Sequence, residues 1–237
     1  MIDFHTHLLP GIDDGSQCLA DTIEMATEEK RQGTCHIIAT PHFYASRNYL
    51  DAFLAKRNAS YDRTVAELSD RPQYPTIILG AEVYYFAKIG KAEMLPRLCI
   101  GETSCLLLEM PFCQWTQEMA DDIRTIISRR KITVILAHLE RYIKYQKNKE
   151  PWDEILSLPV IIQLNGEAFL DWRKRRFALK MVESGRDILL GSDCHNMTDR
   201  KPNLMEARAY IQKKLGEAPL NRIDALGEAI LRREREL

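Results

Sequence analysis

The sequence predicts an α/β fold built on a seven-stranded (β/α)7, TIM-like barrel. Two observations carry this prediction. Seven short apolar segments alternate with stretches of helical periodicity, which is typical of parallel strands buried on both faces. In addition, histidine and carboxylate side chains stand at or just after the C-terminal ends of six of the seven segments. A closed barrel brings all of these ends to one mouth, whereas an open sheet joins only the strands beside its switch point.

Each predicted strand is a short run of β-branched and aliphatic residues. The first opens the chain in MIDFHTH, and the second, TCHIIAT, is followed directly by Pro41 and His42. The later runs are TIILGAE, SCLLLE, ITVILAH, VIIQLN and DILLGSD. The predicted strands are therefore the N-terminal run and residues 34–40, 76–82, 104–109, 132–138, 160–165 and 187–193.

Helices are predicted between the strands, where apolar residues recur at helical spacing among charged ones. Glycine or proline marks several of their ends, as at Gly33, Pro75 and Gly185. The predicted helices are 19–32, 48–68, 116–130, a short segment after Pro151, and 168–183. Residues 203–237 predict two further helices, separated by Pro219, which carry no candidate ligand and which we expect to pack on the barrel.

The composition is that of an ordinary globular chain, with 237 residues, 45% of them hydrophobic and 28% charged, and a formal net charge of −1. This charge gives no reason to expect nucleic acid or an anionic membrane as a partner, and no apolar run approaches the roughly 20 residues of a membrane span. Without a Gly/Ser-rich linker or a repeat, we expect residues 1–237 to form one domain. The polar N-terminus does not resemble a signal peptide, and six cysteines without a CxxC pair indicate reduced thiols, so we expect a cytoplasmic protein.

The N-terminal stretch MIDFHTHLLPGIDDG predicts part of a metal site. His5 and His7 are two positions apart, so in a strand both imidazoles point to the same side. The following loop holds adjacent aspartates between Gly11 and Gly15, which permit tight bends. Such a loop can turn the carboxylate of Asp13 or Asp14 back toward the two histidines.

Matching ligand types follow the later strands. Imidazoles and carboxylates are the donors that divalent transition metals bind, and burying several carboxylates without a countercharge costs several kcal/mol each. The candidate metal ligands are His5, His7, Asp14, His42, Glu82, Glu109, His138, Asp193 and His195. His36 is the exception among the histidines, because it stands at the start of its strand and is expected to be structural.

This set exceeds the needs of one ion, because a first-row metal takes about four to six ligands. Two or three ions about 4 Å apart would use all of the ligands, and their surplus positive charge would complement a phosphate monoester. Arg141, in HLERY, and Arg200, in HNMTDR, follow two of the ligands. Guanidinium groups bind phosphate oxygens bidentately, so both arginines are candidate phosphate contacts.

Seven motifs resemble the polymerase-and-histidinol-phosphatase (PHP) superfamily of metal-dependent phosphoesterases, and most closely its bacterial capsule-type protein-tyrosine phosphatases. The motifs run in order from Met1 to Asn196 and are MIDFHTHLLPGIDDG, ATPHF, GAEV, LLLEMP, AHLERY, QLNGE and GSDCHN. The resemblance thus covers nearly the whole chain apart from its C-terminal helices. It implies the distorted seven-stranded PHP barrel, with a trinuclear site that is usually supported by manganese.

The resemblance also implies which ligands each ion takes. The first ion would be held by His5, His7, Glu82 and Asp193; the second would share Glu82 with Glu109 and His138; the third would take Asp14, His42 and His195. Fe²⁺, Zn²⁺ or Mg²⁺ are alternatives to Mn²⁺. Arg141 and Arg200 fall where family members contact phosphate. The implied substrate is the tyrosine-rich tail of a bacterial tyrosine kinase that controls polysaccharide export.

This chain departs from the family pattern in the sequence HFY at 42–44, where many relatives have a second histidine. The aromatic residues near the predicted mouth are Tyr44, Tyr84, Tyr85 and Phe112. Two roles stay open for them: binding an aromatic ring, or ordinary packing. Cys194 stands between two candidate ligands but faces the other way in an extended backbone, so we expect a packing role for it. We expect no covalent phosphoenzyme, on the interpretation that the chain has no CxxxxxR nucleophile loop.

The sequence leaves several alternatives open. The same chemistry could act on a small phosphomonoester such as histidinol phosphate, and a protein of another class, a non-catalytic metal-binding scaffold, is a second alternative. The complete ligand set favours an enzyme over a scaffold. The metal, the true substrate and the oligomeric state stay open at this point.

Overall fold

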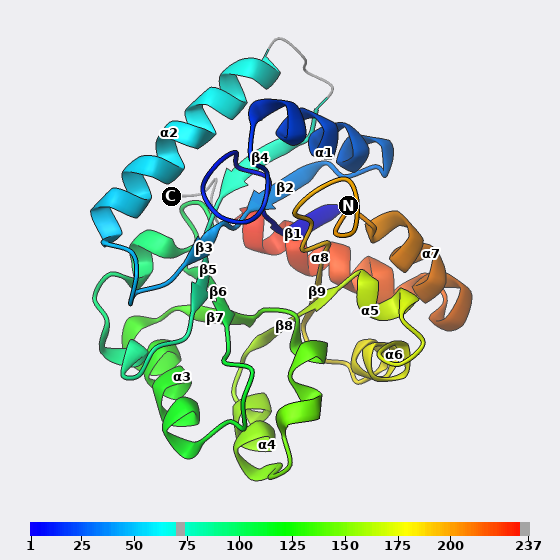
Figure 1. Ribbon diagram of the computed structural model, residues 1–237. Coiled ribbons are helices and arrows are strands. Elements are labelled where there is room, and N and C mark those ends of the chain that lie inside the picture. Colours follow the sequence, from blue (N-terminus) through cyan, green and yellow to red (C-terminus); the bar gives the residue numbers. More distant parts are fainter. Residues whose placement is uncertain (70–73, 233–237) are drawn as a thin grey trace.

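The computed structural model describes residues 1–69 and 74–232 and has parallel strands surrounded by helices (Figure 1). The α/β class and the parallel strand direction are as predicted. The strands are β1 (Ile2–Thr6), β2 (His36–Ala39), β3 (His42–Phe43), β4 (Thr76–Leu79), β5 (Glu82–Tyr84), β6 (Cys105–Glu109), β7 (Thr133–Leu136), β8 (Ile161–Asn165) and β9 (Ile188–Gly191). The α-helices are α1 (Leu19–Arg31), α2 (Leu50–Ser69), α3 (Gln117–Arg130), α4 (Glu150–Ser157), α5 (Glu167–Leu170), α6 (Arg175–Glu183), α7 (Leu204–Leu215) and α8 (Ala218–Arg232).

Two predicted strands are each divided into two. The segment 34–40 and the residues after it form β2 and β3, and the segment 76–82 continues into β5 after a break at Gly80 and Ala81. Pro41, between β2 and β3, has no N–H to donate to a strand ladder. The two divided strands stay hydrogen-bonded at the break, because the N–H of Gly80 donates to the carbonyl of Ala39 (2.8 Å).

The predicted closed barrel is not confirmed, because the described strands form two sheets rather than one ring. One has the order β1-β2-β4 and the other the order β3-β5-β6-β7-β8-β9. Between β1 and β9 a single parallel bridge joins Thr6 to Cys194. The carboxylate of Asp3 lies in this seam and accepts hydrogen bonds from the N–H groups of Ser192 (2.9 Å) and His5 (3.0 Å). Two backbone hydrogen bonds also cross the seam, from the N–H of Asp193 to the carbonyl of His5 (2.7 Å) and from the N–H of His7 to the carbonyl of Cys194 (2.9 Å), so a side chain takes part of the ladder where the ring would close.

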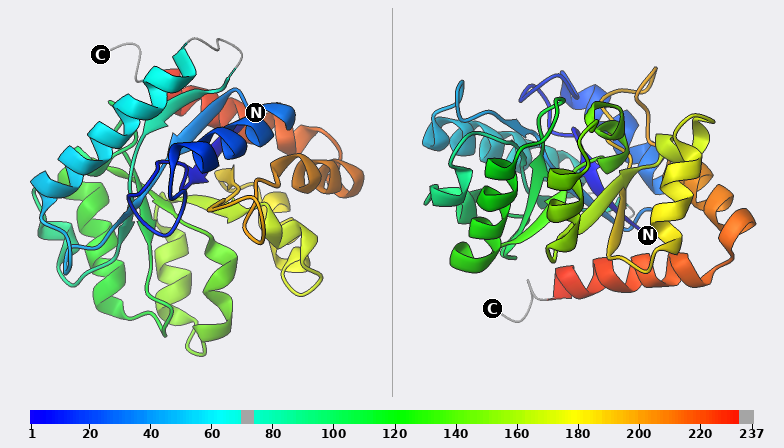
Figure 2. Two further views of the ribbon diagram at one scale, coloured as in Figure 1. Left: turned by 45° about the horizontal axis from the view of Figure 1, so that its top comes forward. Right: turned by 90° about the horizontal axis from the view of Figure 1, so that it is seen from below.

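One apolar cluster joins both sheets. It contains Phe4 of β1, Ile38 of β2, Leu107 of β6 and Leu189 of β9, all buried. Helix α8 adds Ile230 and Leu231 to the cluster. In Figure 2, right, α8 lies across the end from which the strands start. The C-terminal end of the sheets is therefore the one that stays open to the loops.

The prediction of one continuous helix over residues 168–183 is wrong, because the structure has two helices there, α5 and α6. Between them the side chain of Asp171 accepts a hydrogen bond from the backbone N–H of Arg173 (2.9 Å). Such local side-chain bonds compete with helical ones.

The two C-terminal helices are present, but Pro219 lies in the first turn of α8 rather than between them. A proline at this position of a helix needs no N–H partner. Residues 233–237 of that prediction lie outside the described residues. Among the residues described, no helix has both the length and the apolar character for crossing a bilayer.

A substitution at Gly191 tests the close approach of β9 to β1. A methyl group there would lie 2.5 Å from Cβ of His5 and 2.8 Å from Nε2 of Gln163, so Gly191→Ala should lower the free energy of unfolding by about 1–3 kcal/mol through overpacking. Urea unfolding in the presence of a chelator measures this. Glu228→Ala, at a side chain that is 67% exposed, is the control and should change stability by less than about 0.5 kcal/mol. Equal stability of both variants would contradict the packing described.

Candidate metal centre

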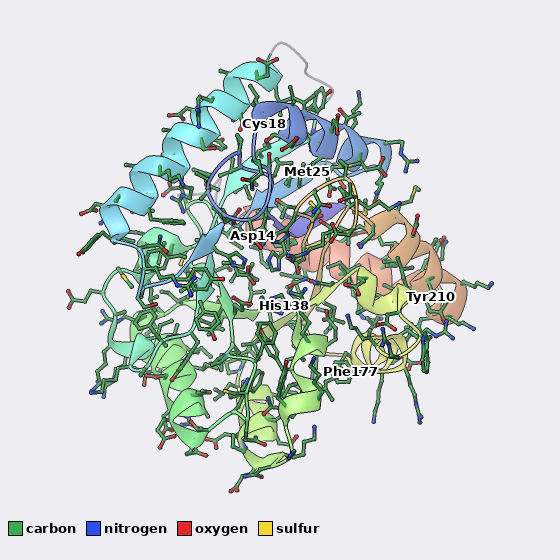
Figure 3. The ribbon with its side chains drawn as sticks, viewed as in Figure 1. Asp14, Cys18, Met25, His138, Phe177 and Tyr210 are labelled. Atoms are coloured by element: carbon green, nitrogen blue, oxygen red, sulfur yellow. The ribbon has the colours of Figure 1, made fainter. Side chains whose placement is uncertain are left out.

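A cavity of about 820 Å³ opens at the C-terminal end of the strands. Its wall includes His42, Glu82, Glu109, Arg141, Asp193 and Arg200. Figure 3 shows Asp14 and His138 near the middle of the ring of helices, with Phe177, another cavity residue, further out toward α6. The predicted ligand side chains therefore gather at one edge of the fold.

Four ligand atoms from three strand ends form the tightest group. Nε2 of His5 lies 3.2 Å from Nε2 of His7, and these two nitrogens lie 3.2 and 3.3 Å from Oε2 of Glu82. Oδ1 of Asp193 lies 3.6 and 3.5 Å from the same nitrogens. Four ligands placed tetrahedrally about 2.1 Å from one ion would be about 3.4 Å apart. These five separations are close to that value, and His5, His7 and Asp193 form one candidate metal-binding group.

The carboxylate of Glu82 also contacts two further histidines. Nε2 of His138 lies 2.9 Å from Oε1, and Nδ1 of His42 lies 2.9 Å from Oε2. Glu109 adds a second carboxylate, with Oε1 3.6 Å from His138 Nε2 and Oε2 4.0 Å from His42 Nδ1. The two histidines thus lie on two sides of the paired carboxylates.

Asp14 completes a third group. Its Oδ1 lies 3.5 Å from Nε2 of His42 and 3.5 Å from Nε2 of His195. His7 belongs to the same group, and its ring centroid lies 3.8 Å from that of His195. Asp14 is the most exposed member of the set, with 67% of its side chain accessible.

The three groups differ slightly from the predicted division. His7 belongs to two of them, and His42 lies with Glu82 and Glu109 as well as with Asp14. Glu82 is grouped with His42 and Glu109 rather than with His5, His7 and Asp193, and His138 joins the cluster through its contacts with Glu82 and Glu109. All nine predicted ligand side chains nevertheless meet in one connected cluster. His36 begins β2, so it lies at the opposite end of the strand from this cluster, as expected.

Several buried atoms in the cluster have no hydrogen-bond partner among the described residues: Nδ1 of His42, Oε2 of Glu82, Oε2 of Glu109 and Nε2 of His195. Buried polar atoms are almost always hydrogen-bonded, so each of these needs another partner. The close contact between His42 and Glu82 also lacks hydrogen-bond geometry. Lone pairs that face one another in this way suit divalent cations, and the donor set fits them.

The pKa shifts show how strongly the side chains influence one another. Burial disfavours the carboxylate of Glu82, but the charge of His5 and a hydrogen bond from His138 outweigh it and hold its pKa well below the usual range. Burial, followed by the charge of Glu82, raises the pKa of Glu109 to about 8. Burial, with the charge of His7, lowers the pKa of His195 to about 3. A divalent cation would relieve the repulsion between the carboxylates, as it does in other carboxylate sites.

The backbone is strained at two of these positions. His138 has φ 31° and Asp193 has φ 54°, in the left-handed region that non-glycine residues rarely adopt. At Gly15 the loop folds back so closely that a Cβ would lie 2.2 Å from the carbonyl oxygen of His7. Only glycine fits there, and the bend holds the adjacent aspartates over the histidines.

Sequence reasoning missed residues that orient the ligands. Asp13 Oδ2 lies 2.7 Å from Nδ1 of His7, which leaves Nε2 for the cluster. Gln163 contacts Nδ1 of His5 (3.1 Å) and accepts a hydrogen bond from the N–H of His138 (2.7 Å), while Asn165 donates to Asp193 (2.9 Å). Strand β8 therefore contributes to the site, although the predicted strand 160–165 offered no ligand. Two polar residues at alternate positions of a buried strand were the available signal.

The two predicted arginines both contact Asp193. Nη1 of Arg141 lies 3.0 Å from Oδ2, and Nη2 of Arg200 donates to Oδ1 (2.8 Å). Arg141 follows β7 in a 3-10 turn and Arg200 lies in the loop after β9. Their side chains are 29% and 32% exposed, and a guanidinium has five N–H donors. Further donors are thus available to a ligand in the cavity.

Cys194 and Arg200 have the CxxxxxR spacing of cysteine-dependent phosphatases, so the interpretation that the chain lacks this motif is wrong. The thiol is completely buried, and burial, with the charges of Glu29 and Asp3, raises its pKa well above the usual range. A thiolate is required for nucleophilic attack. The position and protonation of Cys194 therefore agree with a packing role.

Residues 1–229 match the family model described as capsular polysaccharide synthesis, CpsB/CapC. The chain belongs to this family. Among curated CpsB/CapC relatives, it is 28% identical over 235 residues to the tyrosine-protein phosphatase CpsB of Streptococcus agalactiae serotype III (strain NEM316), covering 94% of each chain. It is 26% identical over 239 residues to the tyrosine-protein phosphatase YwqE of Bacillus subtilis, covering 99% of this chain and 92% of YwqE.

The fold of this CpsB/CapC member is also found in solved structures. A chain from the crystal structures of YwqE from Bacillus subtilis and CpsB from Streptococcus pneumoniae, described as unique metal-dependent tyrosine phosphatases, superimposes with a TM-score of 0.85. The sequence identity is 24%, and the match covers 98% of this chain and 94% of that one. At this identity the likeness establishes the fold.

The raised pKa of Glu109 predicts a pH dependence of stability in this family member. Its ordinary pKa is 4.5 and its folded value about 8, so between these values the folded chain keeps a proton that the unfolded chain loses, and stability falls as pH rises. In chelator, Glu109→Gln should gain about 1–3 kcal/mol relative to wild type between pH 5 and pH 8. Urea unfolding at both pH values measures this. Asp51→Asn, at an 86% exposed side chain, is the control; the same pH dependence in Glu109→Gln and wild type would contradict the shift.

Proposed function

We propose that this CpsB/CapC chain is a metal-dependent protein-tyrosine phosphatase. The observation that carries the proposal is a connected cluster of nine chelating side chains, of which His42, Glu82, Glu109 and Asp193 line one cavity together with Arg141 and Arg200. The names of the relatives, tyrosine-protein phosphatases CpsB and YwqE, support the same activity. A bacterial tyrosine kinase whose phosphorylation controls capsule or exopolysaccharide synthesis is the proposed protein substrate, and the cytoplasm is the proposed location.

The proposed cofactor is a set of three divalent ions, with Mn²⁺ the first choice and Fe²⁺, Zn²⁺ or Mg²⁺ as alternatives. His5, His7, Glu82 and Asp193 would hold the first ion, which the 3.2–3.6 Å separations of their ligand atoms support. Glu82, Glu109 and His138 would hold the second, and Asp14, His42 and His195 the third. When bound, such ions supply nucleophilic water at neutral pH and neutralise developing negative charge.

The protein's own side chains would bind the phosphate and orient the metal ligands. Arg141 and Arg200 would bind oxygens of the phosphate, because guanidinium pairs match phosphate geometry. Their contacts with Asp193 hold both guanidinium groups beside the cluster. Asp13 and Gln163 fix the rings of His7 and His5 so that Nε2 of each faces the centre. This advance positioning lowers the cost of reorganisation during the reaction.

The finer description of the fold belongs to the proposal as well. We propose that the two sheets act as one distorted barrel of seven segments, formed by residues 1–237 as one domain. The bridge between Thr6 and Cys194, and the apolar cluster shared by both sheets, support this description. It explains why ligands from strands far apart in sequence reach one mouth.

Removal of one ligand tests the function. His42→Ala should reduce turnover of a phosphotyrosyl peptide at saturating Mn²⁺ by at least about 100-fold, because ligand loss disrupts the charge-neutralising centre, while the circular dichroism spectrum stays that of the wild type. Phosphate release, with and without chelator, is the measurement. Tyr49→Ala, at a side chain that is 88% exposed, should keep full activity.

The same assay separates the alternatives. Faster turnover of histidinol phosphate than of the peptide would favour a small-molecule phosphomonoesterase. Lack of turnover of either substrate by the manganese-loaded wild type would favour a non-catalytic metal-binding scaffold. Wild-type activity in His42→Ala would show that the assigned centre is wrong.

A further inference from the structure

Two of the aromatic rings that line the cavity, those of Tyr44 and Phe112, pack against histidines of the cluster. Phe112 is 40% exposed, and Tyr44 is partly buried; both line the cavity. An exposed phenylalanine beside a charged cluster loses the burial that normally stabilises this side chain. Neither ring has a place in the metal or phosphate assignments above.

Each ring packs against a different histidine of the cluster. The Tyr44 ring centroid lies 5.3 Å from that of His42, and the Phe112 centroid lies 5.9 Å from that of His138 at an interplanar angle of 13°. His42 contacts Oε2 of both Glu82 and Glu109, whereas His138 contacts Oε1 of both. The two aromatic rings therefore flank the paired carboxylates from two sides.

The neighbouring aromatic residues support this pair in different ways. Tyr84 packs behind Tyr44, with ring centroids 5.4 Å apart. Tyr142, which is fully buried, packs against Phe112 at 5.2 Å. Tyr85, in contrast, is buried, and its hydroxyl donates a hydrogen bond to the carboxylate of Asp122 in α3. Of the four aromatic residues singled out in the sequence, Tyr85 points into the core and takes no part in the cavity wall.

We propose that Tyr44 and Phe112 form a two-sided slot that binds the phenyl ring of an aryl phosphate and selects aryl over alkyl phosphate esters. The proposal rests on the proposed phosphatase function and adds the residues that determine its specificity. Aromatic rings prefer offset or edge contacts with centroids 4.5–7 Å apart, and a ring whose phosphate reaches the cluster passes between the two side chains. An alkyl phosphate offers no ring to this slot.

The test compares ligands with and without a phenyl ring on manganese-loaded protein. In Phe112→Ala and in Tyr44→Leu, the inhibition constant of phenylphosphonate should rise by about three- to tenfold, which is the usual effect of losing one ring pair. The inhibition constant of inorganic phosphate should stay unchanged, because the metal ligands and both arginines remain. The conservative variants Phe112→Tyr and Tyr44→Phe should keep the wild-type ratio of the two constants.

The controls separate failure of the slot from failure of the phosphatase function. Tyr49→Ala should keep the wild-type ratio. If the wild type hydrolyses phosphotyrosyl peptide but either Phe112→Ala or Tyr44→Leu keeps the wild-type ratio, the two-sided slot is wrong while the function stands. If the wild type hydrolyses no phosphate ester, calorimetric titration with phenylphosphonate and phosphate still measures the ratio. Phe112→Leu replaces Phe112→Ala if the latter does not fold, and it too should lose the preference.

Discussion

The carboxylate of Glu82 is the contact on which the candidate centre depends. It is 1% exposed and lies within 3.3 Å of nitrogens from His5, His7, His42 and His138. A buried carboxylate is costly unless it is paired, and here four imidazoles surround it, two from the end of β1 and the residue after it, and one each from β3 and the turn after β7. Glu109 stands beside it, and burial, followed by the charge of Glu82, raises the pKa of Glu109. Divalent cations satisfy both requirements.

The fold brings these groups together by departing from a regular sheet. The breaks after β2 and β4 let His42 and Glu82 begin new strands, where they are directly paired in register. At the seam between β1 and β9, the carboxylate of Asp3 takes ladder hydrogen bonds and leaves His5 and Asp193 next to each other. The left-handed backbone at His138 and Asp193 belongs to the same pattern. Strain of this kind is typical of sites where side-chain placement outweighs local stability.

Much of this arrangement could be predicted from the sequence, because hydrophobic runs and polar strand ends are local features. The seven apolar segments and the nine clustered side chains were found in this way. The division of two strands could not, since Pro41 and Gly80 stand close to runs that otherwise satisfy strand periodicity. The roles of Asp3 and Gln163 depend on contacts with residues at 192 and 138, which are distant in sequence. The turn at Asp171 interrupts the predicted helix because a side-chain hydrogen bond competes there with the helical hydrogen bonds.

The most direct test of the central claim is the metal content of the wild type and of Glu82→Gln after reconstitution with Mn²⁺, measured by elemental analysis. Glutamine keeps the shape of the side chain but removes the charge that the proposed ions share. We expect about three ions per wild-type chain and loss of more than half of them in Glu82→Gln, in a protein that remains folded. Equal metal content in the two proteins, or a wild type that holds no metal, would contradict the account.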